Sequence, residues 1–219
     1  MKNKLLKLIL AVAITTSAPA YSLVLTFEGL GDLAPVGSFY NTAPQDYDVV
    51  FSSNALALVD SDAGGSGNFG GEPSPNTALY FNTGTSITLD ALSGFSTGFS
   101  FYYSAINMGG NINIFDAGGQ TGSVLASLNL GTTPTNGALD PTGSFSPFIP
   151  VGITFSGTAR SVGLMGTANQ IIFDDITLGS SVPGRAIPEP GTLILLGGGL
   201  LLLGIFGLSR RGKSKKYPD

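Results

Sequence analysis

Cysteine, histidine and tryptophan are all missing from the 219 residues of this sequence. Without cysteine there can be no disulfide framework and no thiol nucleophile. Without histidine there can be no Ser-His-Asp triad and no histidine-ligated zinc or iron site. Of the common hydrolytic mechanisms, only a pair of carboxylates of the glycosidase type remains. The sequence therefore offers no residue that we assign as catalytic, and we expect a protein that is not an enzyme.

Basic residues are also scarce in the middle of the chain. Between Tyr21 and Ile187 there are twelve acidic residues but only two basic ones, Arg160 and Arg185, so this part carries a net charge of about −10. The whole chain has a net charge of only −4, because most of its lysines and arginines lie at the two ends. Nucleic-acid binding needs clustered Lys or Arg and is excluded, whereas such a surface attracts cations such as calcium.

Glycine is frequent, with 32 residues, and the middle of the chain shows no amphipathic helical pattern. Short β patterns alternate there with glycine-rich turns, which predicts an all-β fold. The clearest alternation runs from Phe95 to Tyr103, and further strands are expected at residues 23–27, 112–114, 124–130, 151–155, 162–164 and 170–178. Many short strands at this spacing indicate an antiparallel β-sandwich of jelly-roll type spanning residues 21–179.

The beginning of the chain has the three parts of a secretory signal peptide. Lys2, Lys4 and Lys7 form a basic start, the apolar run Leu8–Ile14 follows, and Ala18–Ala20 provides small residues for signal peptidase. The apolar run is too short to cross a bilayer comfortably. We therefore expect residues 1–20 to be a signal peptide that is cleaved after Ala20, and the module to act outside the cytoplasm.

The end of the chain has a second tripartite pattern, at residues 187–216. An apolar stretch of 17 residues, 192–208, is roughly 25 Å long as a helix, near the lower limit for a transmembrane span. A Pro-Glu-Pro box precedes it and a basic cluster follows it, the key residues being Pro188, Glu189, Pro190, Arg210, Arg211 and Lys213. The basic cluster should remain cytoplasmic, which agrees with the orientation that the signal peptide demands. An ordinary permanent tail anchor is the alternative interpretation.

This tail closely resembles the PEP-CTERM sorting signal of Gram-negative bacteria. The resemblance implies that an exosortase, a membrane transpeptidase, cuts near the box and passes the protein to the cell surface or the extracellular matrix. The middle is similar to a sandwich module common in such proteins, through residues 26–30, 94–103 and 170–176. Residues 180–186 are then a linker between the module and the sorting signal.

The longest irregular stretch, from Asp60 to Asn76, contains fragments of three ligand-binding motifs, but each is incomplete. Its G-x-G-x-x-G run is followed by no helix, its EF-hand spacing puts Glu72 one residue late, and its calcium-repeat pattern has Phe69 where aspartate is needed. We interpret the stretch as a flexible surface loop.

Three acids are better candidates for a structural calcium site: Glu28, Asp174 and Asp175. Strand alternation places Asp174 on the face of Ile172 and Ile176, and Asp175 on the opposite face, so one carboxylate should point toward the core. Because jelly rolls often pair their first and last strands, Glu28 should lie near them. Two or three carboxylates at one place need a cation, and calcium is the natural one. The alternative is that these acids accept backbone N–H bonds.

The ligand of the module is left open by the sequence. Tyr102 lies on the strand face opposite Phe99 and Phe101, so it is a weak candidate for contact with a sugar. The leading interpretation is a non-enzymatic surface or matrix protein associated with exopolysaccharide. A lectin-like carbohydrate-binding module is one alternative, and a polysaccharide hydrolase with paired carboxylates is another.

Overall fold

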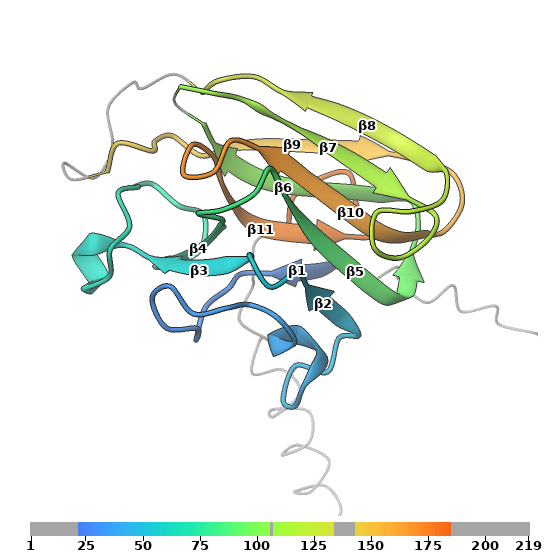
Figure 1. The fold of residues 1–219 in the computed structure, drawn as a ribbon, viewed down its shortest axis with the longest axis horizontal. Coiled ribbons are helices and arrows are strands. Elements are labelled where there is room, and N and C mark those ends of the chain that lie inside the picture. The colour runs from blue at the N-terminus through green and yellow to red at the C-terminus, as the bar shows by residue number, and fades with distance from the viewer. Residues whose placement is uncertain (1–21, 106, 134–142, 185–219) are drawn as a thin grey trace, which may run out of the picture.

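The computed structural model describes residues 22–105, 107–133 and 143–184 (Figure 1). These residues form eleven β-strands and two short 3-10 helices, η1 (Phe39–Asn41) and η2 (Ser61–Ala63). The strands are β1 (Leu23–Leu25), β2 (Val49–Phe51), β3 (Leu56–Val59), β4 (Thr77–Tyr80), β5 (Ser86–Phe95), β6 (Gly98–Ser104), β7 (Gly110–Phe115), β8 (Val124–Leu130), β9 (Ile149–Thr154), β10 (Ala159–Gly166) and β11 (Ile172–Leu178).

The strands build two antiparallel sheets that face each other as a sandwich (Figure 1). The first sheet has the order β3-β4-β11-β6-β9, and β1 also pairs with β11. The second sheet has the order β2-β5-β10-β7-β8. The strand β11 therefore pairs with three others, including the first strand of the fold. The expected all-β antiparallel sandwich, with its first and last strands paired, is confirmed.

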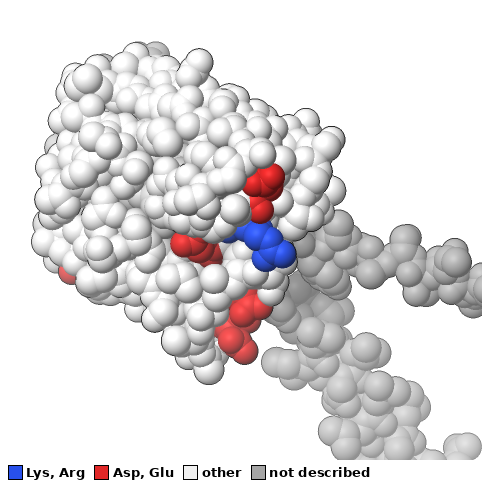
Figure 2. Space-filling view, turned by 45° about the vertical axis from the view of Figure 1, so that its right-hand side comes forward, with Lys and Arg blue, Asp and Glu red and all other residues white. Residues whose placement is uncertain are grey.

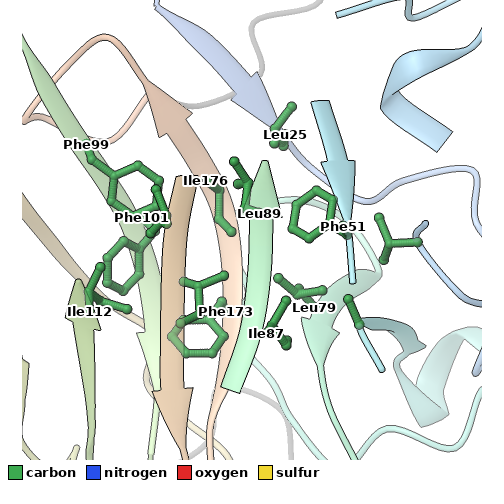
Figure 3. Packing of buried hydrophobic residues seen from close by; sticks show 14 of the residues in the cluster. Leu25, Phe51, Leu79, Ile87, Leu89, Phe99, Phe101, Ile112, Phe173 and Ile176 are labelled. Carbon is green, nitrogen blue, oxygen red and sulfur yellow. The ribbon is translucent and has the colours of Figure 1, made fainter. Parts of the chain in front are cut away.

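The core fills the space between the two sheets (Figure 3). Alternate residues of each strand point inward, and Phe99 and Phe101 of β6 share this core with Ile87 and Leu89 of β5 from the other sheet. The rings of Phe101 and Phe173 lie 5.7 Å apart at a steep angle, a favourable aromatic geometry. Burial of this apolar area is the main force that holds the sheets together.

A second, smaller hydrophobic cluster covers the outer face of the first sheet. It consists of Leu58, Phe69, Ala78, Tyr80, Phe148 and Ile172, with Leu56, Tyr102 and Phe145 packed against it. Phe69 comes from the irregular stretch 60–76 and is fully buried, with its ring 6.0 Å from that of Phe148. That stretch is therefore fastened to the sheet by a buried side chain, in addition to forming η2, and is not simply a surface loop.

The strand predictions were right for type but incomplete in extent. The predicted run from Phe95 to Tyr103 is two strands, because the chain turns at Ser96 and Thr97, where Thr97 has a φ of 76°. β2 to β4 were not predicted, since they are only three or four residues long, and β4 buries every side chain and so shows no alternation. The alternation of Ile87, Leu89 and Ala91 in β5 was present in the sequence but was overlooked.

The predicted alternation along β11 was also wrong. Asp174 and Thr177 lie opposite Tyr102 and Ser100 of β6, so that two residues, Asp175 and Ile176, face only one on the neighbouring strand. Such a β-bulge reverses the alternation beyond it. Asp175 takes up the distortion with a φ of 47°, and Ile176 joins Phe173 in the core instead of sharing a face with Ile172.

The predicted signal peptide and the sorting signal with its 192–208 helix lie outside the described residues. Within the residues that the structure describes, no helix is long and apolar enough to cross a membrane.

Candidate functional site

The carboxylate of Glu28 is bound to the segment Ser74–Thr77, which leads into β4. One oxygen accepts hydrogen bonds from the backbone N–H groups of Asn76 (3.0 Å) and Thr77 (2.8 Å), and the other accepts one from the Thr77 hydroxyl (3.4 Å). Hydrogen bonds to a carboxylate are shorter and stronger than those between neutral groups. Glu28 thus links the end of the first strand to the start of β4.

Asp174 binds the other end of the same segment from β11. Its two oxygens accept hydrogen bonds from the Ser74 hydroxyl at 2.8 and 3.0 Å, and from the Ser74 backbone N–H at 3.2 Å. One of them also accepts the backbone N–H of Asp175 at 2.7 Å. The Ser74 hydroxyl is in addition 3.2 Å from the carbonyl oxygen of Thr26, beside β1. The structure therefore brings Glu28 and Asp174 onto one four-residue segment, Ser74–Thr77.

Tyr40 supports the backbone next to Glu28. Its hydroxyl oxygen accepts the backbone N–H of Phe27 at 2.6 Å. Burial raises the pKa of Tyr40, and the negative charges of Asp174 and Glu28 act in the same direction. The aromatic ring therefore remains neutral and supports the turn that carries Glu28.

The adjacent Asp174 and Asp175 are both fully buried. Burial, and then the charge of Asp175, raises the pKa of Asp174 well above its ordinary value, although the bonds from Ser74 and Asp175 lower it in part. Arg160 of β10 is the only Lys or Arg between residues 22 and 184, and its guanidinium donates to the carbonyl oxygen of Leu92 at 3.0 Å. The negative charge of the pair can therefore be reduced by a proton or by an added cation.

The fit to a metal ion is incomplete in the described part of the chain. No group of three or more Asp, Glu, His or Cys side chains lies there in an arrangement that could hold a metal ion. The oxygens of Glu28 and Asp174 already accept the hydrogen bonds given above. Such bonds explain how these two acids are held, and the calcium site remains a prediction.

A groove on the outer face of the first sheet is the clearest candidate for ligand binding. It has a volume of about 310 Å³. Its floor is formed by the buried side chains of Leu58, Phe69, Tyr80 and Ile172, and its rim by Leu33, Ser66, Asn68, Phe145 and Asn169. An apolar and aromatic floor with a rim of amides and hydroxyls is typical of sites for small polar ligands.

The walls of this outer-face groove are held by contacts between loops. Phe69 and Phe145 form a parallel β-bridge, and the Asn68 side-chain oxygen accepts the backbone N–H of Ser144 at 2.9 Å. Burial raises the pKa of Tyr80, and the charge of Asp32 adds to this, so its hydroxyl remains neutral. No charged side chain lines the groove within the described residues.

Tyr102 is half-buried in the cluster on the same sheet face but does not line the groove. It packs against the buried residues of that cluster. Sequence reasoning missed the groove because its residues come from six separate places in the chain, between Leu33 and Ile172.

Two further pockets open on the surface. One, of about 300 Å³, is lined by Leu23, Tyr47, Asp48, Leu178 and their neighbours, and the other, of about 290 Å³, by Asp90, Leu92, Gly118 and Arg160 among others. Each of these two contains one carboxylate, and the outer-face groove contains none. These three pockets therefore do not supply the pair of acids that glycoside hydrolysis needs.

On the face shown in Figure 2, acidic groups are few and lie around a single basic patch on a largely uncharged surface.

The sorting residues Pro188, Glu189 and Pro190, like the basic residues Arg210, Arg211 and Lys213, lie outside the described residues. Comparison with protein families nevertheless finds a known motif that includes most of these residues. Residues 186–211 match the PEP-CTERM protein-sorting motif. The match contains the whole box and the first two basic residues.

Comparison with curated proteins finds no match. Among solved structures, CsCBM6-3 from Clostridium stercorarium in complex with cellobiose is 17% identical, with a TM-score of 0.37, over 63% of this chain and 91% of that one. The cleaved adhesin domain of Lys-gingipain from Porphyromonas gingivalis is 12% identical, with a TM-score of 0.39, over 73% of this chain and 98% of that one.

A family 43 arabinoxylan arabinofuranohydrolase from Bacillus subtilis in complex with cellotetraose is 17% identical, with a TM-score of 0.37. That match covers 69% of this chain but only 28% of the hydrolase. At these identities and TM-scores the likenesses say nothing of what this chain binds.

The buried pair of acids generates a prediction about pH. The folded state holds a proton on Asp174 more tightly than the unfolded chain does, since its pKa is raised above the ordinary 3.8. The free energy of unfolding should therefore fall as the pH rises from about 3.8 toward the raised pKa, and recover as the pH falls again. One such group contributes at most about 1.4 kcal/mol per pH unit.

Urea denaturation of residues 21–184 between pH 4 and pH 8, in the presence of a chelator, measures this effect. The stability of wild type relative to Asp174→Asn should rise as the pH falls, and the same comparison with Asp46→Asn, at an exposed residue, is the control. Parallel curves for wild type and Asp174→Asn would contradict the raised pKa.

Proposed function

We propose that this chain is an exported precursor whose C-terminal segment is read by an exosortase-type membrane enzyme, so that the mature module is released to the cell surface. The observation that carries the proposal is the match of residues 186–211 to the PEP-CTERM protein-sorting motif. The predicted signal peptide, handled by signal peptidase, and the C-terminal basic cluster agree on which side of the membrane the module lies.

The structure fits this arrangement in one respect. The last strand, β11, ends at Leu178, and the described chain continues only to Gly184. The module is thus complete before the motif begins, so that cleavage at the Pro188–Pro190 box would remove no strand of the sandwich. The mature form would be a folded module with a short C-terminal extension.

Replacement of Glu189 tests whether the box is read by an enzyme. A permanent anchor needs only apolar length and a basic stop, so it would be indifferent to Glu189→Ala. A subsite that holds the carboxylate would lose a charged partner, which leaves buried donors unpaired at a cost of about 1–3 kcal/mol. We expect Glu189→Ala to be exported and inserted normally but to accumulate uncleaved in the inner membrane.

The matched control replaces residues 193–208 by another apolar sequence of equal length, which should be tolerated better. Mass spectrometry of the mature C-terminus gives the readout. A wild-type protein that keeps its Arg210–Lys216 cluster at steady state, or a Glu189→Ala protein that matures normally, would identify an ordinary anchor.

We further propose that the module is not an enzyme and binds a neutral glycan, such as exported polysaccharide, in the outer-face groove. The supporting observation is the groove itself, whose aromatic floor and amide rim suit the apolar faces and hydroxyls of a sugar ring. The absence of charged side chains from its described lining favours an uncharged ligand over an acidic one.

Asn169 allows a test of the groove with little strain. It lies exposed at the rim with a φ of 58°, which glycine also adopts readily. Asn169→Gly should weaken glycan binding about fivefold, the effect of one lost hydrogen bond. Asp46→Gly, at another exposed residue with positive φ outside the groove, is the control. A glycan array and titration calorimetry give the readout, and lack of retention on any glycan would leave a purely structural role.

Calcium remains a proposed structural cofactor at Glu28, Asp174 and Asp175. The ion would offset the charge of two adjacent buried carboxylates, and it would have to displace some of the hydrogen bonds from Ser74. Calcium at about 100 times its dissociation constant should then stabilise the module by roughly 2.7 kcal/mol. Identical melting curves in calcium and in chelator would rule this site out.

A further inference from the structure

The described chain does not leave the sandwich freely after β11. Residues 179–184, which we term the docked tail, fold back over the outer face of the first sheet. The backbone N–H of Gly179 donates to the carbonyl oxygen of Gly98 at 3.0 Å, and the Thr97 hydroxyl donates to the carbonyl oxygen of Gly179 at 2.6 Å. The Ser100 hydroxyl donates to the carbonyl oxygen of Ser180 at 2.8 Å.

The far end of the docked tail is fastened as well. The backbone N–H of Gly184 donates to the Thr177 hydroxyl at 3.0 Å. Within the tail, the Ser180 hydroxyl accepts the backbone N–H of Val182 and donates to its carbonyl oxygen. Val182 itself is 70% exposed, so the tail is held by polar contacts of its backbone and not by burial of an apolar side chain.

Two strand glycines make room for this contact. A Cβ atom on Gly152 of β9 would lie 2.0 Å from the carbonyl oxygen of Ser181, and one on Gly98 of β6 would lie 2.4 Å from its backbone nitrogen. Neither glycine has a positive φ, so backbone conformation does not require glycine at these positions. Glycine within a strand weakens it and often marks the close approach of another backbone. Here that backbone is the docked tail.

Docking fixes how far the sorting box extends from the module. Pro188 follows Gly184 by four residue steps, which span at most about 14 Å when fully extended. A domain of this size has a radius of gyration of about 15 Å. On the other side of the box, only Gly191 separates Pro190 from the apolar stretch at 192–208. An enzyme that grips the box must therefore work between a bilayer and a folded module that is almost in contact with it.

We propose that Ser100, Gly98 and Gly152 are positioning residues for C-terminal processing. They hold the docked tail on the sheet, and the tail has to lift off before the sorting enzyme can enclose the Pro-Glu-Pro box. Release of the tail as far as Gly179 extends the reach from about 14 Å to about 30 Å. The rate of processing then depends on the fraction of molecules in which the tail is released. This inference rests on the processing proposed above.

Two variants loosen the tail by different means. Ser100→Ala removes one hydrogen bond, which shifts the release equilibrium by about fivefold. Gly152→Ala places a methyl group where the Ser181 carbonyl lies and should release the tail further. Ser127→Ala, at a serine of β8 that bonds Asn113 and does not touch the tail, is the matched control.

The first measurement is hydrogen exchange in the full-length precursor, purified from cells without the sorting enzyme. The backbone amides of Gly179 and Gly184 should exchange at least fivefold faster in Ser100→Ala and Gly152→Ala than in wild type, while the core strands β6 and β11 should keep their protection. If these two amides exchange as fast in wild type as in both variants, the tail is not docked, and the inference is overturned.

The second measurement is the rate of processing in cells that contain the sorting enzyme, followed by pulse-chase. Ser100→Ala should be cleaved about fivefold faster than wild type, and Gly152→Ala faster still. A spacer of six Gly and Ser residues inserted after Gly184 should accelerate wild type and remove the difference between it and both variants. A merely structural effect of the substitutions would not be cancelled by the spacer.

The outcomes separate the two proposals. Faster tail exchange with unchanged or slower cleavage would overturn the role of the tail and leave the sorting function intact. No cleavage of wild type or of the spacer form would overturn the sorting function, and this inference with it.

Discussion

The β-bulge at Asp174–Thr177 is the constraint on which the other features of the first sheet depend. By inserting one extra residue opposite β6, it turns Ile176 into the core and leaves Asp174 facing Ser74. It also places the Thr177 side chain on the outer face of the sheet, where its hydroxyl accepts the backbone N–H of Gly184 from the docked tail. A regular strand would reverse the orientation of every residue beyond the bulge, so the carboxylate contacts and the tail contact could not both form.

Hydrogen bonds beside the bulge explain how Asp174 is accommodated in the interior. Asp174 is held by the Ser74 hydroxyl and two backbone N–H groups, which offsets part of the cost of burying its charge. The same bonds fasten the irregular stretch 60–76 to the last strand, while Glu28, which follows β1, accepts the backbone N–H of Asn76 at the end of that stretch. Polar groups thus do at this end of the sandwich what a disulfide does in many exported domains, in a chain that has no cysteine.

Sequence patterns predicted the fold class and most strands, because alternating apolar residues report directly which face of a strand is buried. They also led to the expectation that Glu28 lies near Asp174, because jelly rolls often pair their first and last strands, and both acids do bind the segment Ser74–Thr77. The patterns failed where a single residue departs from regular geometry. Asp175 in the bulge and Thr97 in the turn both have a positive φ, but neither is a glycine, so the sequence gives no signal of that conformation. The outer-face groove was unpredictable for another reason: its residues approach only through long-range loop contacts such as the bridge of Phe69 to Phe145.

The division of the chain into a module and a sorting signal is less complete in the structure than in the sequence. Composition marks residues 180–186 as a linker, and a linker of small residues is expected to be flexible. Nevertheless, Ser180 forms a hydrogen bond to β6 and Gly184 forms one to β11. Ser181, between them, lies over the strand glycines Gly98 and Gly152. Neither Gly98, at the start of β6, nor Gly152, within β9, has a positive φ, and a Cβ atom at either position would collide with the backbone of Ser181. The module therefore carries a site for its own tail, and the separation between folding and sorting lies after Gly184 and not after β11.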